Sequence, residues 1–195
     1  MKNFIIIAAA LFLSASPLMS EDLDAIFAKV KEFTAQKNYT KALEELSWAK
    51  REIEQLNSKK IETYFPDSLA GYKGAKIESN SVLGITNIER EYKDGAKSVK
   101  LSLTGGSASG AGGGLAAFGK MAAMMGGQQG SDTVRIKGRT ATIEESNSST
   151  SITIFMDSGS MLKFESYDSA DVATLRKMAE ELDMDGLDAY QKGGK

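Results

Sequence analysis

The spacing of apolar residues changes twice along the chain, and no other feature of the sequence constrains the fold as strongly. Up to about residue 64, apolar side chains recur every three or four positions, which is typical of amphipathic helices. Between residues 75 and 167 they alternate with polar side chains, which is typical of strands, and the helical spacing returns after residue 169. Helices at both ends of a strand-rich region predict an α+β fold.

The segment 21–64 is predicted to form a helical hairpin. Its apolar stripe is interrupted at residues 36–38, and the Phe65-Pro66 step ends it because proline lacks a backbone donor. Residues 38–49 resemble half of a single tetratricopeptide repeat, whereas a solenoid needs about three stacked units. We therefore expect the hairpin to pack on its own domain, with a partner as the alternative. The stripe consists of Leu23, Ile26, Phe27, Val30 and Phe33, followed by Tyr39, Ala42, Leu43, Leu46, Ala49, Ile53 and Leu56.

Residues 65–190 are predicted to form an antiparallel sheet domain. The connections between its strands are short, whereas parallel neighbours need a crossover of a dozen or more residues. Asp94-Gly95 is a hairpin-turn signal because both residues tolerate a positive φ. The predicted strands lie around Ile77 and at residues 85–92, 99–104, 133–137, 139–144, 151–156 and 161–167.

A C-terminal helix is predicted at residues 169–185, before a flexible tail at 191–195. Asp168 or Ser169 can cap its N-terminus, and Gly186 is expected to end it. The residues around this glycine resemble part of a calcium loop, but a lysine stands where the loop needs a bidentate glutamate. The helix end is therefore the favoured interpretation.

The first twenty residues are predicted to be a secretory signal peptide. Lys2 precedes an apolar run at residues 4–13, and small or turn residues follow up to a cleavage site after Ser20. An uncleaved anchor is less favoured because a bilayer span needs about 20 apolar residues. Nothing after residue 20 resembles a membrane span, so we expect a periplasmic or secreted protein with no stable span after cleavage.

The composition argues against most catalytic chemistry. The chain has no His and no Cys, which excludes a Ser-His-Asp triad, a thiolate nucleophile and a zinc site of these residues. Its 24 Lys and Arg against 26 Asp and Glu give no basic excess for nucleic acid. We predict a protein that is not an enzyme, with no catalytic residues, no cofactor and no metal.

A glycine- and methionine-rich insert at residues 105–130 is the most unusual segment, and a helix is predicted within it. The stretch 114–120 has the spacing of a phosphate-binding loop, but Met121 stands where the magnesium-binding Ser or Thr is needed. Methionine sulfurs suit Cu(I), but too few of them share one helical face. Two interpretations remain: the helix covers one face of the sheet, or its apolar side contacts a partner or ligand. The candidate contact residues are Leu115, Phe118, Met121, Met124 and Met125.

Pairs of carboxylates on the predicted strands offer one catalytic hypothesis. Glu89 and Glu91 are two residues apart on a strand and therefore share a face. The acid and base of a glycosidase must likewise lie on one surface, close to each other. Arg90 and Lys93 make the surroundings polar, and the sequence shows no apolar pocket that would separate two pKa values. A solvated sheet face is the favoured interpretation.

Five segments of the mature chain are distinctive: LSWA at 46–49, FPDSLAGY at 65–72, EREYKDG at 89–95, the Gly/Met-rich insert and the ending at 175–187. Through these segments the mature chain as a whole resembles an uncharacterised group of bacterial secreted or periplasmic proteins. The resemblance implies the layout described above and a place in the cell envelope, and it implies no activity, ligand or functional residue.

These observations favour an exported, soluble binding or interaction protein of the bacterial cell envelope, whose partner is an envelope protein. The alternative is a periplasmic carrier that holds a small apolar ligand or lipid between its sheet and the insert helix. The sequence does not define an oligomeric state.

Overall fold

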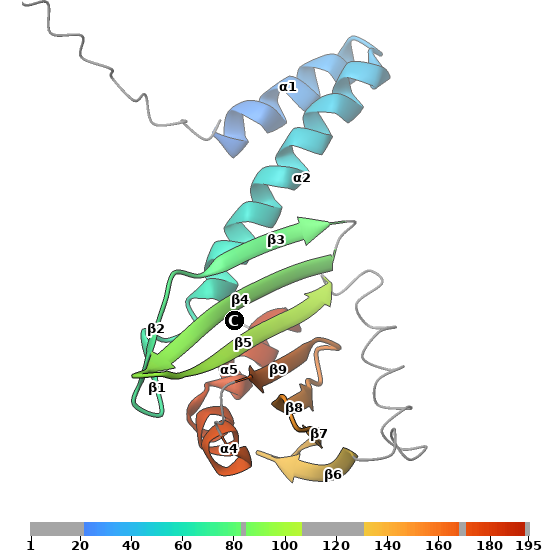
Figure 1. Ribbon diagram of the computed structural model, residues 1–195. Helices are drawn as coiled ribbons and strands as arrows, with labels where there is room; N and C mark the ends of the chain where they lie inside the picture. Colours follow the sequence, from blue (N-terminus) through green and yellow to red (C-terminus); the bar gives the residue numbers. More distant parts are fainter. Residues whose placement is uncertain (1–21, 83–84, 107–130, 168–170, 194–195) are drawn as a thin grey trace, which may run out of the picture. The chain divides into compact units, whose positions relative to one another are not determined.

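The computed structural model describes residues 22–82, 85–106, 131–167 and 171–193 (Figure 1). The fold class is α+β as predicted, with an N-terminal helical hairpin, a large antiparallel sheet and helices at the C-terminal end. The chain divides into two compact units, residues 1–55 and 56–195. The predicted signal peptide and most of the Gly/Met-rich insert lie outside the described residues.

The helical hairpin is formed by α1 (Leu23–Ala35) and α2 (Tyr39–Glu62), which confirms the predicted break. The side chain of Asp22 caps α1 by accepting the backbone N–H of Asp24 at 3.2 Å. Between the helices Lys37 adopts a φ of 58°, the left-handed conformation that reverses the chain. The last turns of α2 belong to the second unit.

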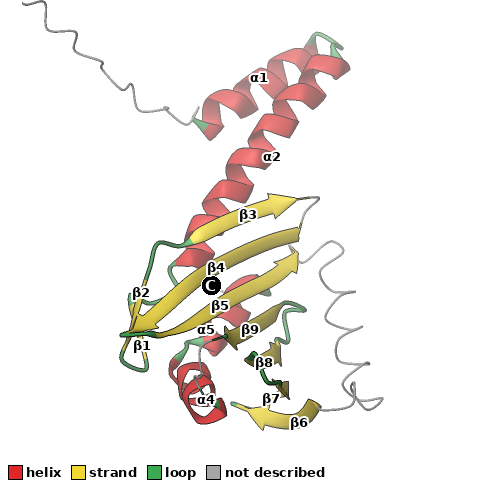
Figure 2. Ribbon diagram, in the orientation of Figure 1, coloured by secondary structure: helices red, strands yellow, loops and turns green. Residues whose placement is uncertain are grey.

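All neighbouring strands of the second unit pair antiparallel, in the order β1-β2-β4-β5-β9-β8-β7-β6, with β3 also paired to β4 (Figure 2). Two short strands, β1 and β2, were not expected from the sequence. The strands are β1 (Ser68–Leu69), β2 (Tyr72–Gly74), β3 (Glu78–Val82), β4 (Ile85–Asp94), β5 (Lys97–Gly106), β6 (Ser131–Ile136), β7 (Arg139–Glu145), β8 (Thr150–Phe155) and β9 (Met161–Ser166).

The two longest strands, β4 and β5, form the hairpin predicted from Asp94-Gly95. Asp94 pairs with Lys97, and Gly95 has a φ of 59°, which a residue with a side chain adopts less readily. Because β4 is long, it pairs with β2 at one end and with β3 at the other, along the same edge. Residues 75–77, between β2 and β3, belong to neither strand.

One face of the sheet carries the apolar core of the second unit. Helix α4 packs on this core against β8, β6 and β9, and α5 and the end of α2 add buried side chains to it. Alternate residues of the central strands point into the core, as the two-residue period predicts. The largest fully buried side chains are Ile88, Tyr92, Leu101, Leu103, Ile152, Ile154, Met156, Leu162, Phe164, Leu175, Met178 and Leu182.

The C-terminal end has two helices where the sequence analysis expected one. These are α4 (Val172–Glu181), capped by Asp171 rather than by the residues proposed from the sequence, and α5 (Met184–Gln191). Gly186 does not end a helix, because the carboxylate of Asp183 accepts its N–H at 3.0 Å and begins α5. Across the described part of the chain, no helix is long and apolar enough to cross a membrane.

Candidate functional site

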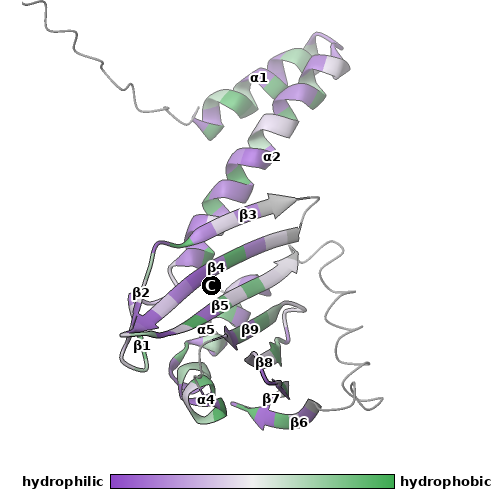
Figure 3. Cartoon of the chain, viewed as in Figure 1, coloured by the Kyte–Doolittle hydropathy of each residue, from purple (hydrophilic) through white to green (hydrophobic). Residues whose placement is uncertain are grey.

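The second face of the sheet is polar, since the residues between the core positions point to it. Along β4, Ile88 and Tyr92 are fully buried, whereas Glu89 and Glu91 lie on the opposite face and are partly exposed. Figure 3 shows hydrophilic and hydrophobic residues following one another along β4 and β5. Strands β3, β5 and β9 add charged and hydroxyl side chains to this polar face, which confirms the predicted solvated face for Glu89 and Glu91.

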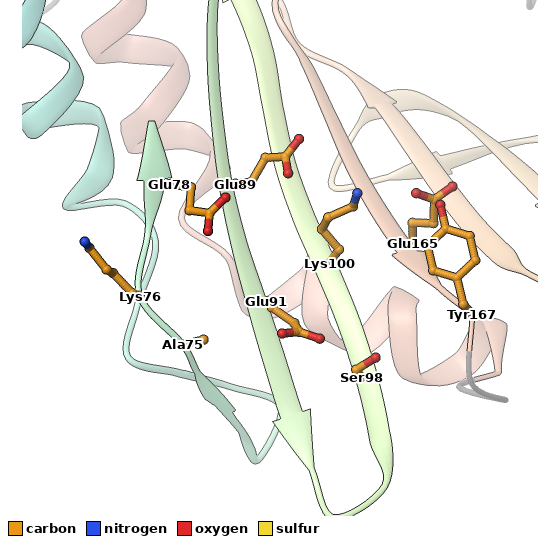
Figure 4. Close-up of a pocket in the computed structure, with 9 residues that line it drawn as sticks. All are labelled: Ala75, Lys76, Glu78, Glu89, Glu91, Ser98, Lys100, Glu165 and Tyr167. Carbon is orange, nitrogen blue, oxygen red and sulfur yellow. The ribbon is translucent and has the colours of Figure 1, made fainter. Parts of the chain in front are cut away.

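A pocket of about 420 Å³ lies on this polar face (Figure 4). Its walls come from β3, β4, β5, β9 and the segments beside them, so the pairing of the strands sets its shape. Four of its residues are glutamates and two are lysines, and the others include two hydroxyl groups. The lining residues are Ala75, Lys76, Glu78, Glu89, Glu91, Ser98, Lys100, Glu165 and Tyr167.

Three charges alternate across the floor of the pocket. Lys100 of β5 stands directly opposite Glu91 of β4 on one side and Glu165 of β9 on the other. Glu91 also forms an ion pair of 2.9 Å with Lys93, and Glu165 forms one with Lys163. Each glutamate in this part of the floor therefore has lysines beside it.

The end of the pocket nearest β3 is not balanced. Glu78 and Glu89 stand directly opposite each other on β3 and β4, and neither forms an ion pair with a described residue. Asn87 donates a hydrogen bond of 2.8 Å to Glu89 and accepts one of 2.9 Å from Thr104, which fixes the position of the Glu89 carboxylate. Like charges directly opposite each other destabilise a sheet.

Glu165 and Tyr167 form a hydrogen-bonded wall on the β9 side. Burial alone would raise the pKa of Glu165, but hydrogen bonds from Lys163 and Tyr167 hold that pKa below its usual range. Donation to Glu165 raises the pKa of Tyr167 in turn, because the carboxylate favours the protonated hydroxyl. The ring of Tyr167 is 60% exposed and lies beside Glu165 in Figure 4.

The chain segment at the edge of the pocket is held from behind by Arg90, a buried residue of the core face. Its Nε donates to the carbonyl of Ala75 at 2.8 Å, and its Nη1 donates to the carbonyl of Phe65 at 2.6 Å. Its Nη2 pairs with Asp67 at 2.7 Å. A Cβ on Gly74 would overlap the guanidinium, so a larger residue here would displace Arg90 from these hydrogen bonds. The expectation that Arg90 belongs to the surroundings of Glu89 and Glu91 was wrong, because alternate strand residues face opposite ways.

A second buried charge cluster, around Arg139, holds α5 to the sheet. Nε and Nη2 of Arg139 donate to Asp188 at 2.9 and 2.8 Å, and Nη2 also reaches Asp185 at 2.8 Å. Burial alone would raise the pKa of Asp188, but the backbone N–H of Ser158 and the Arg139 guanidinium keep it low. Within the described residues, no buried side-chain N or O atom lacks a hydrogen bond, so the polar atoms of this cluster are satisfied inside the fold.

The contact residues proposed from the sequence are not part of this site. Leu115, Phe118, Met121, Met124 and Met125 lie outside the described residues, as does the stretch that resembles a phosphate-binding loop. The carboxylates of the calcium-like motif contact the protein itself: Asp183 caps α5, and Asp185 pairs with Arg139. The described residues contain no group of three or more His, Cys, Asp or Glu side chains arranged to hold a metal ion.

The pocket itself was missed, although part of it could have been derived. With Asp94-Gly95 as the turn, strand pairing places Lys100 opposite Glu91 by counting alone. Glu165 lies on a strand more than sixty positions farther along, with Tyr167 just after that strand, and no local signal predicts the pairing. Comparison with known proteins adds no assignment, because no family model, no curated protein and no solved structure matches the chain.

Proposed function

We propose that the protein is an exported, non-catalytic binding module of the bacterial cell envelope that holds a ligand bearing ammonium groups in the pocket on its polar sheet face. The observation that carries this proposal is the excess of carboxylates around the pocket, four glutamates against two lysines. Glu91 and Glu165 each pair with a neighbouring lysine, whereas Glu78 and Glu89 form no ion pair with a described residue and share their end of the pocket with Lys76 alone.

An ammonium group fits this end of the pocket for two reasons. It would relieve the repulsion between Glu78 and Glu89, which the chain otherwise tolerates at a cost to stability. The exposed ring of Tyr167 also offers a π face at the opposite wall, and such faces attract cations. A ligand with two or more ammonium groups spaced along a flexible chain, such as a polyamine, would engage both features.

The absence of catalysis is supported by the pKa values around the pocket. A general acid or base works best with a pKa near the operating pH. The pKa of Glu165 is lowered and the pKa of Tyr167 is raised, so both move away from neutrality. The chain also has neither His nor Cys to supply a group that titrates near neutral pH.

Export is supported by the start of the sequence. Lys2 precedes the apolar run at residues 4–13, and small residues follow it, as in secretory signals. The resemblance to bacterial secreted or periplasmic proteins, carried by motifs such as FPDSLAGY at 65–72, supports the same location.

The test is calorimetric titration of the mature protein with spermidine at low and at high salt. We expect weak, saturable binding that declines with salt, since the carboxylates are partly exposed and therefore screened. The double variant Glu78→Gln/Glu89→Gln should bind about tenfold more weakly, which corresponds to about 1.4 kcal/mol. The matched control is Glu144→Gln/Glu145→Gln, which removes two exposed carboxylates of β7 that do not line the pocket.

Equal losses of spermidine affinity in the two double variants would show that binding depends only on net charge, and the pocket would be rejected as the binding site. Native mass spectrometry of protein purified from the periplasm provides an independent check, because it detects molecules retained from the cell. A retained lipid would favour the carrier alternative, whereas a retained polyamine or basic peptide would support the proposal.

A further inference from the structure

The first unit has little core of its own. Three of its described apolar residues are buried: Ile26 of α1, and Ala42 and Ala49 of α2. The two alanines let the helices approach closely, but they bury little apolar area. Helices of this length gain most of their stability from packing an amphipathic face, so this unit calls for a further packing partner.

An apolar stripe on α2 is left exposed. Tyr39, Leu43, Leu46 and Ile53 are 61, 63, 43 and 46% exposed. Their spacing of four, three and seven residues is that of a coiled-coil seam, which places all four on one side of the helix. Exposed apolar surfaces of this kind mark interaction sites.

The stripe continues onto α1. Ile26 marks the side of α1 that faces α2. Because a helix has 3.6 residues per turn, Phe27 lies about a quarter-turn away from Ile26. Since the two helices are antiparallel, this rotation places Phe27 on the same side of the hairpin as the stripe. Phe27 is 45% exposed. The opposite side of α2 carries Trp48, which is 56% exposed and has the guanidinium of Arg51 stacked 3.8 Å from its ring centroid. Trp48 stands alone on its side, whereas five large apolar residues adjoin on the other, which we call the seam face: Phe27, Tyr39, Leu43, Leu46 and Ile53.

The charges on the seam face are compensated. Lys50 occupies the remaining heptad position of the stripe, and Glu54 of the same helix lies 3.8 Å from its ammonium group. Thr40 and Ser47 border the stripe and are uncharged. A second copy of the same face would therefore meet it with each Lys50 beside Glu54 of its own helix, whereas a strongly charged partner would find no excess of opposite charge.

We infer that the seam face is covered by the seam face of a second copy of this chain, with the two α2 helices antiparallel. In an antiparallel coiled coil, an a position of one helix packs against a d position of the other. Here the facing positions lie at equal distances on either side of residue 48. Leu43 then packs on Ile53 of the second copy, and Leu46 packs on the aliphatic stem of Lys50. The two hairpins form a four-helix bundle with twofold symmetry, an interface that meets itself.

Sedimentation velocity of the mature protein over a range of concentrations tests the inference. We expect a shift from monomer to dimer as concentration rises, and we expect Leu43→Glu/Leu46→Glu to abolish it. Both leucines are exposed, so the monomer should keep its fold, which circular dichroism verifies. The matched control is Trp48→Glu, an exposed apolar residue of the same helix outside the seam face, which should still dimerise.

The orientation can be measured because the chain has no cysteine of its own. Spin labels on Ser47→Cys should lie close together, since the two sites are offset by only about 3 Å along the bundle axis. Labels on Thr40→Cys should be offset by about 24 Å in the antiparallel arrangement.

A chain that stays monomeric, a dimer that survives the double glutamate variant, or labels at Thr40 as close as those at Ser47 would each overturn the inference. The first outcome includes the cases in which the seam face binds a membrane surface or the second unit instead.

Discussion

Leu43 and Leu101 are the same residue in opposite surroundings: the first is 63% exposed on α2, and the second is fully buried in β5. The contrast extends to the units around them. The second unit places its large apolar side chains in a continuous core, whereas the first leaves Tyr39, Leu46 and Ile53 at its surface. The second unit buries its large apolar side chains within one chain, whereas the first unit leaves several of its large apolar side chains exposed.

The two units also differ in how they use charge. The second unit buries Arg90 and Arg139, and each guanidinium is satisfied by several hydrogen bonds. An ion pair of the first unit, Lys50 with Glu54, is exposed and adds little stability. We therefore expect substitutions in the two units to differ sharply in effect.

The largest effect is expected at Asp188. Replacing it with alanine leaves Arg139 without its buried partner, and breaking such a pair costs about 3–5 kcal/mol in free energy of unfolding. Urea denaturation followed by circular dichroism measures this loss. Asp185→Ala is the control, because its side chain is 73% exposed and should cost less than about 1 kcal/mol. Similar losses in both variants would contradict the structural role assigned to Asp188.

The next effect comes from the same substitution made in each unit. Leu101→Ala should lower the free energy of unfolding by about 2–5 kcal/mol because it opens a cavity in the core. In the monomer, Leu43→Ala should change it by less than about 0.5 kcal/mol. Urea denaturation checks both, with Trp48, the only tryptophan, as a fluorescent reporter of the first unit. A large loss at Leu43 under monomeric conditions would show that the seam face is already covered.

Acid should weaken the second unit in particular. Glu165, Asp171 and Asp188, whose pKa values are lowered, all lie there. A carboxylate with a depressed folded-state pKa stabilises the fold above its unfolded pKa of about 4, and that contribution is lost as pH falls through the folded pKa. We expect the urea midpoint to fall below about pH 4. The urea midpoint of Asp188→Asn should be lower at neutral pH and should fall less on acidification. An unchanged pH dependence in this variant would argue against protonation of Asp188 as a cause.

The smallest effect is expected at the pocket and has the opposite sign. Glu78→Gln/Glu89→Gln removes two like charges that face each other, so it should stabilise the protein by about 0.2–1 kcal/mol. Thermal denaturation of this variant beside Glu144→Gln/Glu145→Gln separates the local repulsion from the change in net charge. A loss of stability would show that the glutamates are structural residues, and the binding proposal would lose its main support.

Much of the fold follows from local patterns, and the candidate site does not. The spacing of apolar residues predicted the hairpin helices and most strands, because helices and strands differ in period. The same patterns missed β1 and β2, which are too short to show a period, and the second C-terminal helix, which depends on the cap supplied by Asp183.

The pocket depends on long-range pairing. Glu91 and Lys100 are joined by one turn, but Glu165 reaches them only because β9 enters the sheet beside β5. The exposure of the seam face was equally beyond local reasoning. A stripe such as Tyr39, Leu43 and Leu46 has the same sequence pattern whether its own chain or a partner covers it.

The interrupted edge beside β4 has a consequence for how this protein avoids uncontrolled association. A long open strand edge is a template on which other chains add strands and grow into fibrils. Here the edge is shared by two separate pieces, β2 and β3, and residues 75–77 leave the ladder between them while Arg90 holds Ala75 in place. An incoming strand would find no continuous row of donors and acceptors along this side.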